Sequence, residues 1–146
     1  MTADAHHVVA PNAVTVRRCM QETLRHAGIE PADIDAVSAH AASTKVGDRV
    51  EADVLREVFG GRVPPVSAVK SQIGHAMGAS SAIESILAIE GMCRGVLLPT
   101  INYRPDPEIP LDCVAEGARI LDQEFVLKNA FGFGGCNACL VFRRVA

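Results

Sequence analysis

The chain has 146 residues, of which 49% are hydrophobic and 21% are charged, a composition typical of one globular domain with both helices and strands. Its formal net charge is −3 and its Arg and Lys residues are scattered, so the sequence predicts neither a nucleic-acid-binding surface nor a surface for anionic lipids. No apolar run approaches the roughly 20 residues that span a bilayer, and the first residues lack a signal-peptide pattern, so we expect a cytoplasmic protein.

The five cysteines are odd in number and lack the spacing of a disulfide framework, which indicates a reducing compartment. They are Cys19, Cys93, Cys113, Cys136 and Cys139. Cys136 and Cys139 form a C-x-x-C pair, but no second Cys or His pair accompanies it, and in a strand the two side chains would face opposite sides. We therefore expect no metal site.

The first part of the chain predicts a loop, a helix and a strand. Residues 1–12 show no periodicity and are expected to form a loop. Apolar residues then recur at spacings of three and four over residues 13–27, the pattern of an amphipathic helix, and Gly28 is a natural stop. Residues 34–39 form a short apolar run that predicts a strand ending at His40.

The next segment repeats the order of loop, helix and strand. Residues 41–47 are small or carry hydroxyl groups, which would let a substrate approach the backbone closely. Asp48 and Glu51 have the spacing of a capping box, which predicts that a helix starts there, and residues 63–69 predict a second strand. His40 and Lys70 each follow a predicted strand, so parallel neighbours would place both at the edge where open α/β sheets bind ligands.

Residues 69–79 place Lys70 and His75 on a glycine-containing turn between the second strand and a helix. Unpaired N–H groups at a helix start would stabilise an oxyanion, and an imidazole there could donate a hydrogen bond. A single His near a helix start is more often a cap or a packed side chain. This stretch alone leaves both interpretations open.

The helix expected over residues 78–92 is apolar on nearly all sides, which predicts burial between layers. Glu84 lies within it and requires a partner if buried. Lys70 is the nearest cation by topology, whereas a polar seam facing water is the alternative.

The last part of the chain predicts a connector over residues 95–110 and two strands over 125–130 and 138–143. The turn between the strands interleaves glycines with Phe131 and Phe133. It could be an ordinary glycine hairpin or a mobile apolar gate with an exposed N–H. No internal repeat or second domain is evident.

Five segments together resemble the elongating β-ketoacyl-[acyl carrier protein] synthases of the thiolase superfamily. They are residues 39–44, 47–51, 70–79, 99–102 and 131–135. Their order and spacing match over more than a hundred residues. The resemblance implies an α/β, thiolase-like fold, C-terminal half only: a mixed sheet with helices packed on both faces. Residues 1–146 would form the C-terminal domain, with the N-terminal half that carries the nucleophile absent.

The resemblance implies a decarboxylative Claisen condensation, in which a carbanion from malonyl-carrier protein attacks an acyl group held on a cysteine. The catalytic histidines match His40 and His75, which would stabilise the enolate. The catalytic lysine matches Lys70, and Glu84 its ion-pair partner. Phe131 and Phe133 match the gate, and the Phe133 N–H would contribute to the oxyanion hole.

Two departures from the family pattern concern substrate binding and the nucleophile. Ala41 and Ala42 replace a Gly-Thr pair, which removes one hydroxyl for the phosphopantetheine arm at a cost of about 0.5–1.5 kcal/mol, while Thr44 remains to bind it. None of the five cysteines lies in a nucleophile motif, and Cys136, where the family usually has Thr, is expected to pack as a small residue. The chain alone should therefore be inactive.

The implied partners are an acyl carrier protein and either an N-terminal synthase half or a complementary subunit, in a homo- or heterodimer. No resident cofactor is expected, because the substrate is carried on the phosphopantetheine of the carrier protein. A non-catalytic partner of the chain-length type and an inactive truncated fragment are the alternatives. The sequence leaves open whether the product serves fatty acid or polyketide synthesis.

Overall fold

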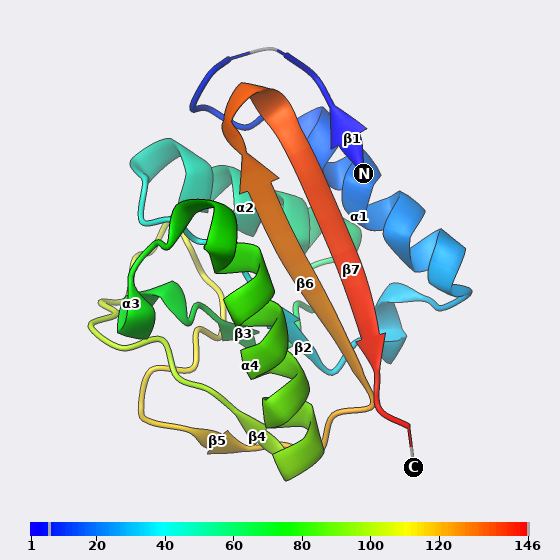
Figure 1. Cartoon of the computed structure of the whole chain (residues 1–146), viewed down its shortest axis with the longest axis vertical. Helices are drawn as coiled ribbons and strands as arrows, with labels where there is room; N and C mark the ends of the chain where they lie inside the picture. The colour runs from blue at the N-terminus through cyan, green and yellow to red at the C-terminus, as the bar shows by residue number, and fades with distance from the viewer. Residues whose placement is uncertain (6, 146) are drawn as a thin grey trace.

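A computed structural model describes residues 1–5 and 7–145, which form a mixed sheet covered by helices on both faces (Figure 1). The strands are β1 (Thr2–Ala3), β2 (Ala36–Ser38), β3 (Val66–Ser67), β4 (Val96–Leu97), β5 (Arg119–Ile120), β6 (Phe125–Gly132) and β7 (Cys136–Arg143). The α-helices are α1 (Ala13–Ala27), α2 (Lys45–Val58), α3 (Lys70–Ile73) and α4 (Ser80–Arg94). Short 3-10 helices cover Pro31–Asp33, Met77–Ala79 and Phe133–Gly135. The expected mixed α/β architecture is confirmed.

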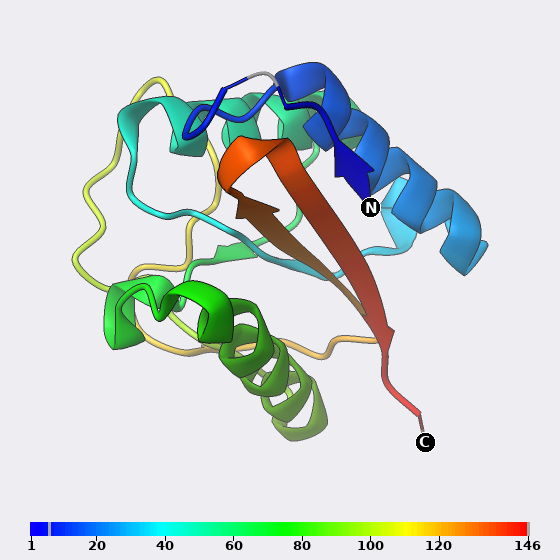
Figure 2. The same cartoon turned by 45° about the horizontal axis from the view of Figure 1, so that its top comes forward.

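The main sheet has the strand order β1-β7-β6-β2-β3. β2 lies parallel to both β3 and β6, whereas β7 is antiparallel to β6 and to β1. α1 and α2 cover one face and α4 covers the other, as the two views together show (Figures 1 and 2). The carboxyl ends of β2 and β3 thus meet at one edge, as expected from the sequence.

The α1 and α2 layer is held by apolar packing. The period of α1 buries Val16, Met20 and Leu24, and that of α2 buries Val54 and Leu55. Asn12 caps the start of α1 through its side chain, and Gly28 ends the helix with a φ of 69°, a conformation that glycine adopts without strain. This helix agrees with its predicted bounds.

The α4 layer differs from the prediction that this helix is buried between layers. Glu84, Gly91 and Met92 face the sheet and are buried, while the apolar face opposite is open to solvent, with Ile86 61% exposed. Because apolar residues occur on nearly all sides of the segment, the sequence pattern does not indicate which side packs on the sheet. α4 is a surface helix within the described part of the chain.

Three short strands were not predicted, because two-residue strands leave no periodic signal. β1 lies in the segment expected to be a loop, and its pairing with β7 joins Thr2 to Asn137. β4 and β5 form a separate antiparallel pair, with β4 inside the predicted connector. No helix among the described residues has the length and hydropathy that crossing a membrane requires.

The start of α2 corrects the predicted capping box. The helix begins at Lys45, and the Thr44 hydroxyl caps it by accepting a hydrogen bond from the Gly47 N–H at 3.1 Å. Asp48 lies one residue further along and accepts from the Thr44 N–H. Glu51 is thereby placed in the second turn of the helix, where it is buried.

Candidate active site

His40 follows β2 and is fixed through its backbone from both sides. Its N–H donates to Glu51 Oε1 at 2.9 Å, and its carbonyl accepts from Lys70 Nζ at 2.5 Å. Glu51 Oε2 accepts from the Ala41 N–H at 2.8 Å, and Oε1 also accepts from the Asn129 side chain. Glu51 thus serves as a buried anchor for the loop that carries His40.

Lys70 opens α3, three positions after the end of β3, and its ammonium donates to the carbonyl of His40. Its ammonium lies 2.6 Å from Glu84 Oε1, and Glu84 is only 1% exposed. The alternative in which Glu84 faces water therefore does not hold. The second oxygen, Oε2, lies 2.6 Å from the ammonium of Lys128 on β6. We call Lys70, Glu84 and Lys128 the charge cluster.

His75 lies between α3 and the 3-10 helix Met77–Ala79. Its Nδ1 accepts from the Met77 N–H at 3.0 Å and lies 3.0 Å from the Ser80 hydroxyl. Because Nδ1 accepts a hydrogen bond from the backbone, the neutral ring carries its proton on Nε2. His75 is therefore arranged to donate a hydrogen bond from Nε2.

The two imidazole rings lie next to each other at one hollow. Their centroids are 5.9 Å apart and their planes are inclined by 82°. The hollow has a volume of about 760 Å³, enough for an extended small molecule. Its lining includes His40, Thr44, Lys70, His75, Phe131 and Phe133. The sequence analysis named all six of these residues. We call this cavity the site hollow.

The environment of His40 keeps its imidazole neutral at physiological pH. Burial and the positive charges of Lys70 and Lys128 lower the pKa of His40 from 6.5 to about 4, while Glu84 acts in the opposite direction. A neutral imidazole has one N–H donor and one acceptor. His40 can thus donate a hydrogen bond to a carbonyl oxygen without carrying a charge, and Nε2 of His75 offers a second donor beside it.

The aromatic pair on the turn between β6 and β7 has two different environments. The Phe131 ring lies 5.4 Å from the His40 ring, whereas Phe133 is 68% exposed on the 3-10 helix Phe133–Gly135. One ring therefore packs against the site and the other stands free at its rim.

The loop after His40 contains backbone conformations that favour glycine. Ala41 has a φ of 30° and Ser43 a φ of 63°, in the left-handed region that costs a residue with a side chain about 1–2 kcal/mol. The strain occurs where the backbone N–H of Ala41 is held by Glu51. Thr44 uses its oxygen lone pair for the cap and keeps its O–H as a donor.

The cysteines are all free and lie in varied environments. Cys19 and Cys139 are buried, while Cys93 and Cys136 are exposed. Cys136 is exposed and lines the site hollow, which corrects the expectation that it packs as a small residue. Within residues 1–5 and 7–145 no three Cys, His, Asp or Glu side chains form a cluster that could hold a metal.

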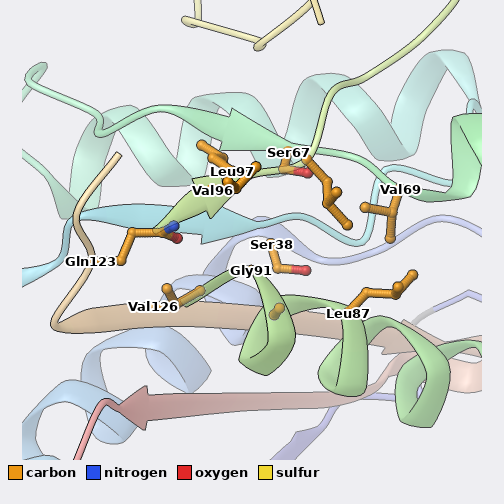
Figure 3. A pocket seen from close by; sticks show the side chains of 11 residues that line it. Ser38, Ser67, Val69, Leu87, Gly91, Val96, Leu97, Gln123 and Val126 are labelled. Carbon is orange, nitrogen blue, oxygen red and sulfur yellow. The ribbon is translucent and has the colours of Figure 1, made fainter. Parts of the chain in front are cut away.

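A second, much smaller cavity lies between β2, β4 and α4 (Figure 3). Ser38, Ser67 and Gln123 contribute polar atoms, and Leu87 and Val126 contribute apolar surface. Its volume of about 20 Å³ has room for about one water molecule. It is too small for a substrate, so the site hollow is the only one of the two cavities that fits one.

Two residues at the site were missed by sequence reasoning. The sequence pattern predicts a helix cap at Glu51 and a strand that contains Lys128, and it indicates no role at the site for either residue. A signal for Lys128 was present, since a charged residue inside the apolar run 125–130 is buried on one face or the other of a central strand. Its partner could not be found from the sequence, because Lys128 is 44 positions away from Glu84.

Comparison with known proteins gives a consistent family. The family model for the β-ketoacyl synthase C-terminal domain matches residues 1–104. The chain is 41% identical over 147 aligned residues to 3-oxoacyl-[acyl-carrier-protein] synthase 2 of Mycobacterium bovis, and the match covers 99% of this chain and 35% of that protein. The chain thus spans about a third of the length of this relative.

Solved structures show the same relationship. The ishigamide ketosynthase/chain length factor superposes with a TM-score of 0.96 at 38% identity over 99% of this chain and 36% of that one. A type II ketosynthase in complex with its acyl carrier protein, AntDE:AntF, gives a TM-score of 0.94 at 31% identity, with the same coverage of the two chains. The thiolase-like fold class, matching the C-terminal part of such enzymes, is confirmed. The chain belongs to the β-ketoacyl synthase family.

Proposed function

We propose that this chain supplies the His40, His75 and Lys70 part of a β-ketoacyl-[acyl carrier protein] synthase. The observation that carries this proposal is the pair of imidazoles, with ring centroids 5.9 Å apart, at a hollow that a buried lysine also lines. Two N–H donors directed at one thioester oxygen would stabilise the negative charge that develops on it. Fatty acid and polyketide synthases both occur among the relatives, so either pathway fits.

The proposed reaction has two stages, transfer of the acyl group to a cysteine and then decarboxylative condensation. A cysteine thiolate first attacks an acyl thioester, so that a new C–S bond forms and the carrier thiolate leaves. Malonyl thioester then loses carbon dioxide, and the electrons of the broken C–C bond form an enolate held by His40 and His75. The enolate carbon attacks the acyl-cysteine carbonyl, and the cysteine thiolate leaves.

The remaining site residues have supporting roles in this proposal. Lys70, held by Glu84, fixes the His40 backbone and contributes positive charge. Thr44 donates its O–H to the phosphopantetheine arm, and the Phe133 N–H contributes to the oxyanion hole. Phe131 and Phe133 form the gate, which is supported by one ring packed on His40 and one standing free.

The partners in this proposal are an acyl carrier protein and a polypeptide segment that provides the nucleophilic cysteine. A structural relative is recorded with its carrier protein, and another with a chain length factor, which supports both kinds of partner. The nucleophile lies outside residues 1–146, either in a longer form of this chain or in a second subunit of a dimer.

A decarboxylation assay tests the role of the histidines. In the protein as isolated with its nucleophile, His75→Ala should abolish carbon dioxide release from malonyl-carrier protein while transfer of the acyl group to cysteine continues. Glu90→Ala, which removes an exposed side chain of α4, is the control and should leave both steps unchanged. Equal loss of both steps in His75→Ala would contradict the assigned role.

The position of the nucleophile is tested separately. Radiolabelled acyl-carrier protein should still acylate the enzyme when Cys136 is replaced by Ala. Peptide mapping should locate the label outside residues 1–146. Loss of labelling in Cys136→Ala would place the nucleophile in this chain and overturn that part of the proposal.

A non-catalytic role of the chain-length type is the second candidate. It is favoured by the ketosynthase/chain length factor structure among the relatives and by Ala42 in place of a hydroxyl residue. In that case the purified complex should decarboxylate malonyl-carrier protein equally well with and without His75→Ala.

A further inference from the structure

Lys128 is a buried lysine that the proposed reaction does not use. It lies in the middle of β6, is 2% exposed, and extends from the sheet toward α4. A lysine is almost never buried without a partner, because transfer of its charge out of water costs several kcal/mol. Its ammonium donates to the Asn129 carbonyl and lies 2.6 Å from Glu84 Oε2.

Glu84 holds two ammonium groups at once, one on each oxygen. Lys70 lies 2.6 Å from Oε1 and Lys128 lies 2.6 Å from Oε2. Lys70 in turn donates to the His40 carbonyl at 2.5 Å. A continuous line of contacts therefore runs from β6, through α4 and α3, to the loop that carries His40.

A carboxylate shared between two cations compensates neither of them fully. One negative charge on Glu84 faces two positive charges, so the charge of Lys70 beside His40 is only partly balanced by its own partner. Without Lys128, Glu84 would pair with Lys70 alone and neutralise it. In a buried site with a low dielectric, such a difference acts over several ångströms.

We propose that Lys128 is a positioning residue of the site: by sharing the Glu84 carboxylate with Lys70, it leaves positive charge beside His40 and favours an anionic group between His40 and His75. This inference rests on the proposed function for the identity of that group, which is the enolate formed on decarboxylation. The electrostatic effect on His40 itself is independent of the reaction.

The groups around His40 support this assignment from every packed element. Burial is the largest cause of the lowered pKa of His40, and Lys70 on α3 and Lys128 on β6 lower it further. The effects of Glu84 on α4, which raises this pKa, and of His75, which lowers it, are smaller. On the α2 side, Glu51 directs its carboxylate to the backbone N–H groups of His40 and Ala41. Burial lowers the pKa of Lys128 and Glu84 raises it again, which fits an ammonium held by a carboxylate.

Titration of the His40 ring by NMR tests the inference without substrate. The protein is labelled on histidine, and the His40 signal is assigned by its loss in His40→Gln. The midpoint in the wild type should lie well below 6.5, and in Lys128→Gln, which replaces the ammonium with a neutral amide, it should rise by about one pH unit. An unchanged midpoint in Lys128→Gln would overturn the inference.

Three further variants complete the test. Lys128→Arg keeps the charge and should keep the low midpoint, whereas Lys128→Met, an apolar replacement, should raise it as Lys128→Gln does. Lys45→Met removes an exposed lysine from α2 and should leave the His40 midpoint unchanged. If both neutral variants fail to fold while Lys128→Arg folds, Lys128 is required only for the fold, and the inference is wrong.

The pH profile of malonyl decarboxylation links the effect to the reaction. The acid limb of Lys128→Gln should move to higher pH by the same interval as the His40 midpoint, and the rate near pH 8 should also fall, because the positive charge that favours the enolate is lost. A purely structural role would lower the rate without moving the acid limb. If the midpoint moves but the wild type releases no carbon dioxide, the proposed function fails and the electrostatic inference stands.

Discussion

The two helical layers that cover the sheet are stabilised in different ways. α1 and α2 bury branched and long apolar side chains on their face of the sheet, including Val16, Met20 and Leu55. On the other face, α4 packs through Met92 and Gly91 at one end and through Glu84 at the other. Successive side chains of β6 point to opposite faces of the sheet, so β6 contributes to both layers. Leu127 packs in the apolar core with α1 and α2, whereas Lys128 belongs to the charge cluster under α4.

The α1 and α2 layer, which we call the scaffold layer, is held by apolar packing, whereas the α4 layer contains the buried charges next to the site. Apolar packing is tolerant of small changes and has no directional requirement, whereas a buried cluster of charges is stable only if every partner is present. Lys70, Glu84 and Lys128 belong to the charged layer, and the His40 loop is held between Lys70 and Glu51 of α2. Substitutions in the two layers should therefore differ in their effects on the free energy of unfolding and on the His40 titration midpoint.

The largest effect is expected from removing the shared carboxylate. Glu84→Ala leaves Lys70 and Lys128 buried without their counter-ion and should reduce the free energy of unfolding by about 3–5 kcal/mol. Urea denaturation measures this. Glu90→Ala on the same helix, which breaks only an exposed pair with Arg94, should cost no more than about 1 kcal/mol. Similar losses in the two variants would refute the distinction.

A core truncation in the scaffold layer should cost slightly less. Leu55→Ala removes a fully buried side chain and should reduce the free energy of unfolding by about 2–5 kcal/mol. Because the charge cluster remains intact, the His40 titration should stay unchanged. Val46→Ala, at an exposed position of the same helix, is the control. A shifted His40 midpoint in Leu55→Ala would show that the two layers are not separable.

A smaller effect concerns pH. Because the pKa of His40 is about 4 in the folded chain and 6.5 in its ordinary state, the unfolded chain takes up a proton that the folded chain refuses. Its contribution to stability is complete above pH 6.5 and is lost as the pH falls to about 4. His40→Asn should therefore lose less stability than the wild type between pH 7.5 and 4.5 in denaturation curves. Equal losses would contradict the lowered pKa.

The smallest effect is expected at the outer face of α4. Ile86 is 61% exposed, so Ile86→Gln should change the free energy of unfolding by no more than about 0.5 kcal/mol. Met92→Ala, at a buried position of the same helix, is the matched control and should cost about 2–5 kcal/mol. A loss on the order of 2 kcal/mol in Ile86→Gln would show that this face is covered in the native protein, and the α4 layer would then have two packed sides.

The sequence alone predicted much of the architecture. The 3.6-residue period of residues 13–27 and the apolar runs after it were sufficient for α1, β2 and β3, and the positions of His40 and Lys70 at strand ends followed from that order. The family motifs marked His75, Glu84, Phe131 and Phe133. Local spacing carries this information, because neighbouring residues in a helix or strand have fixed geometry.

Only the tertiary structure identified the partners of the buried charges. Glu51 has the spacing of a helix cap in the sequence, yet it binds the backbone of His40 and the side chain of Asn129, 78 positions away. Glu84 could have faced water or Lys70, and nothing local indicated that Lys128 would share it. Sequence spacing does not determine such pairs, because a buried charge is satisfied by whichever partner the packing of distant strands and helices brings within hydrogen-bonding distance.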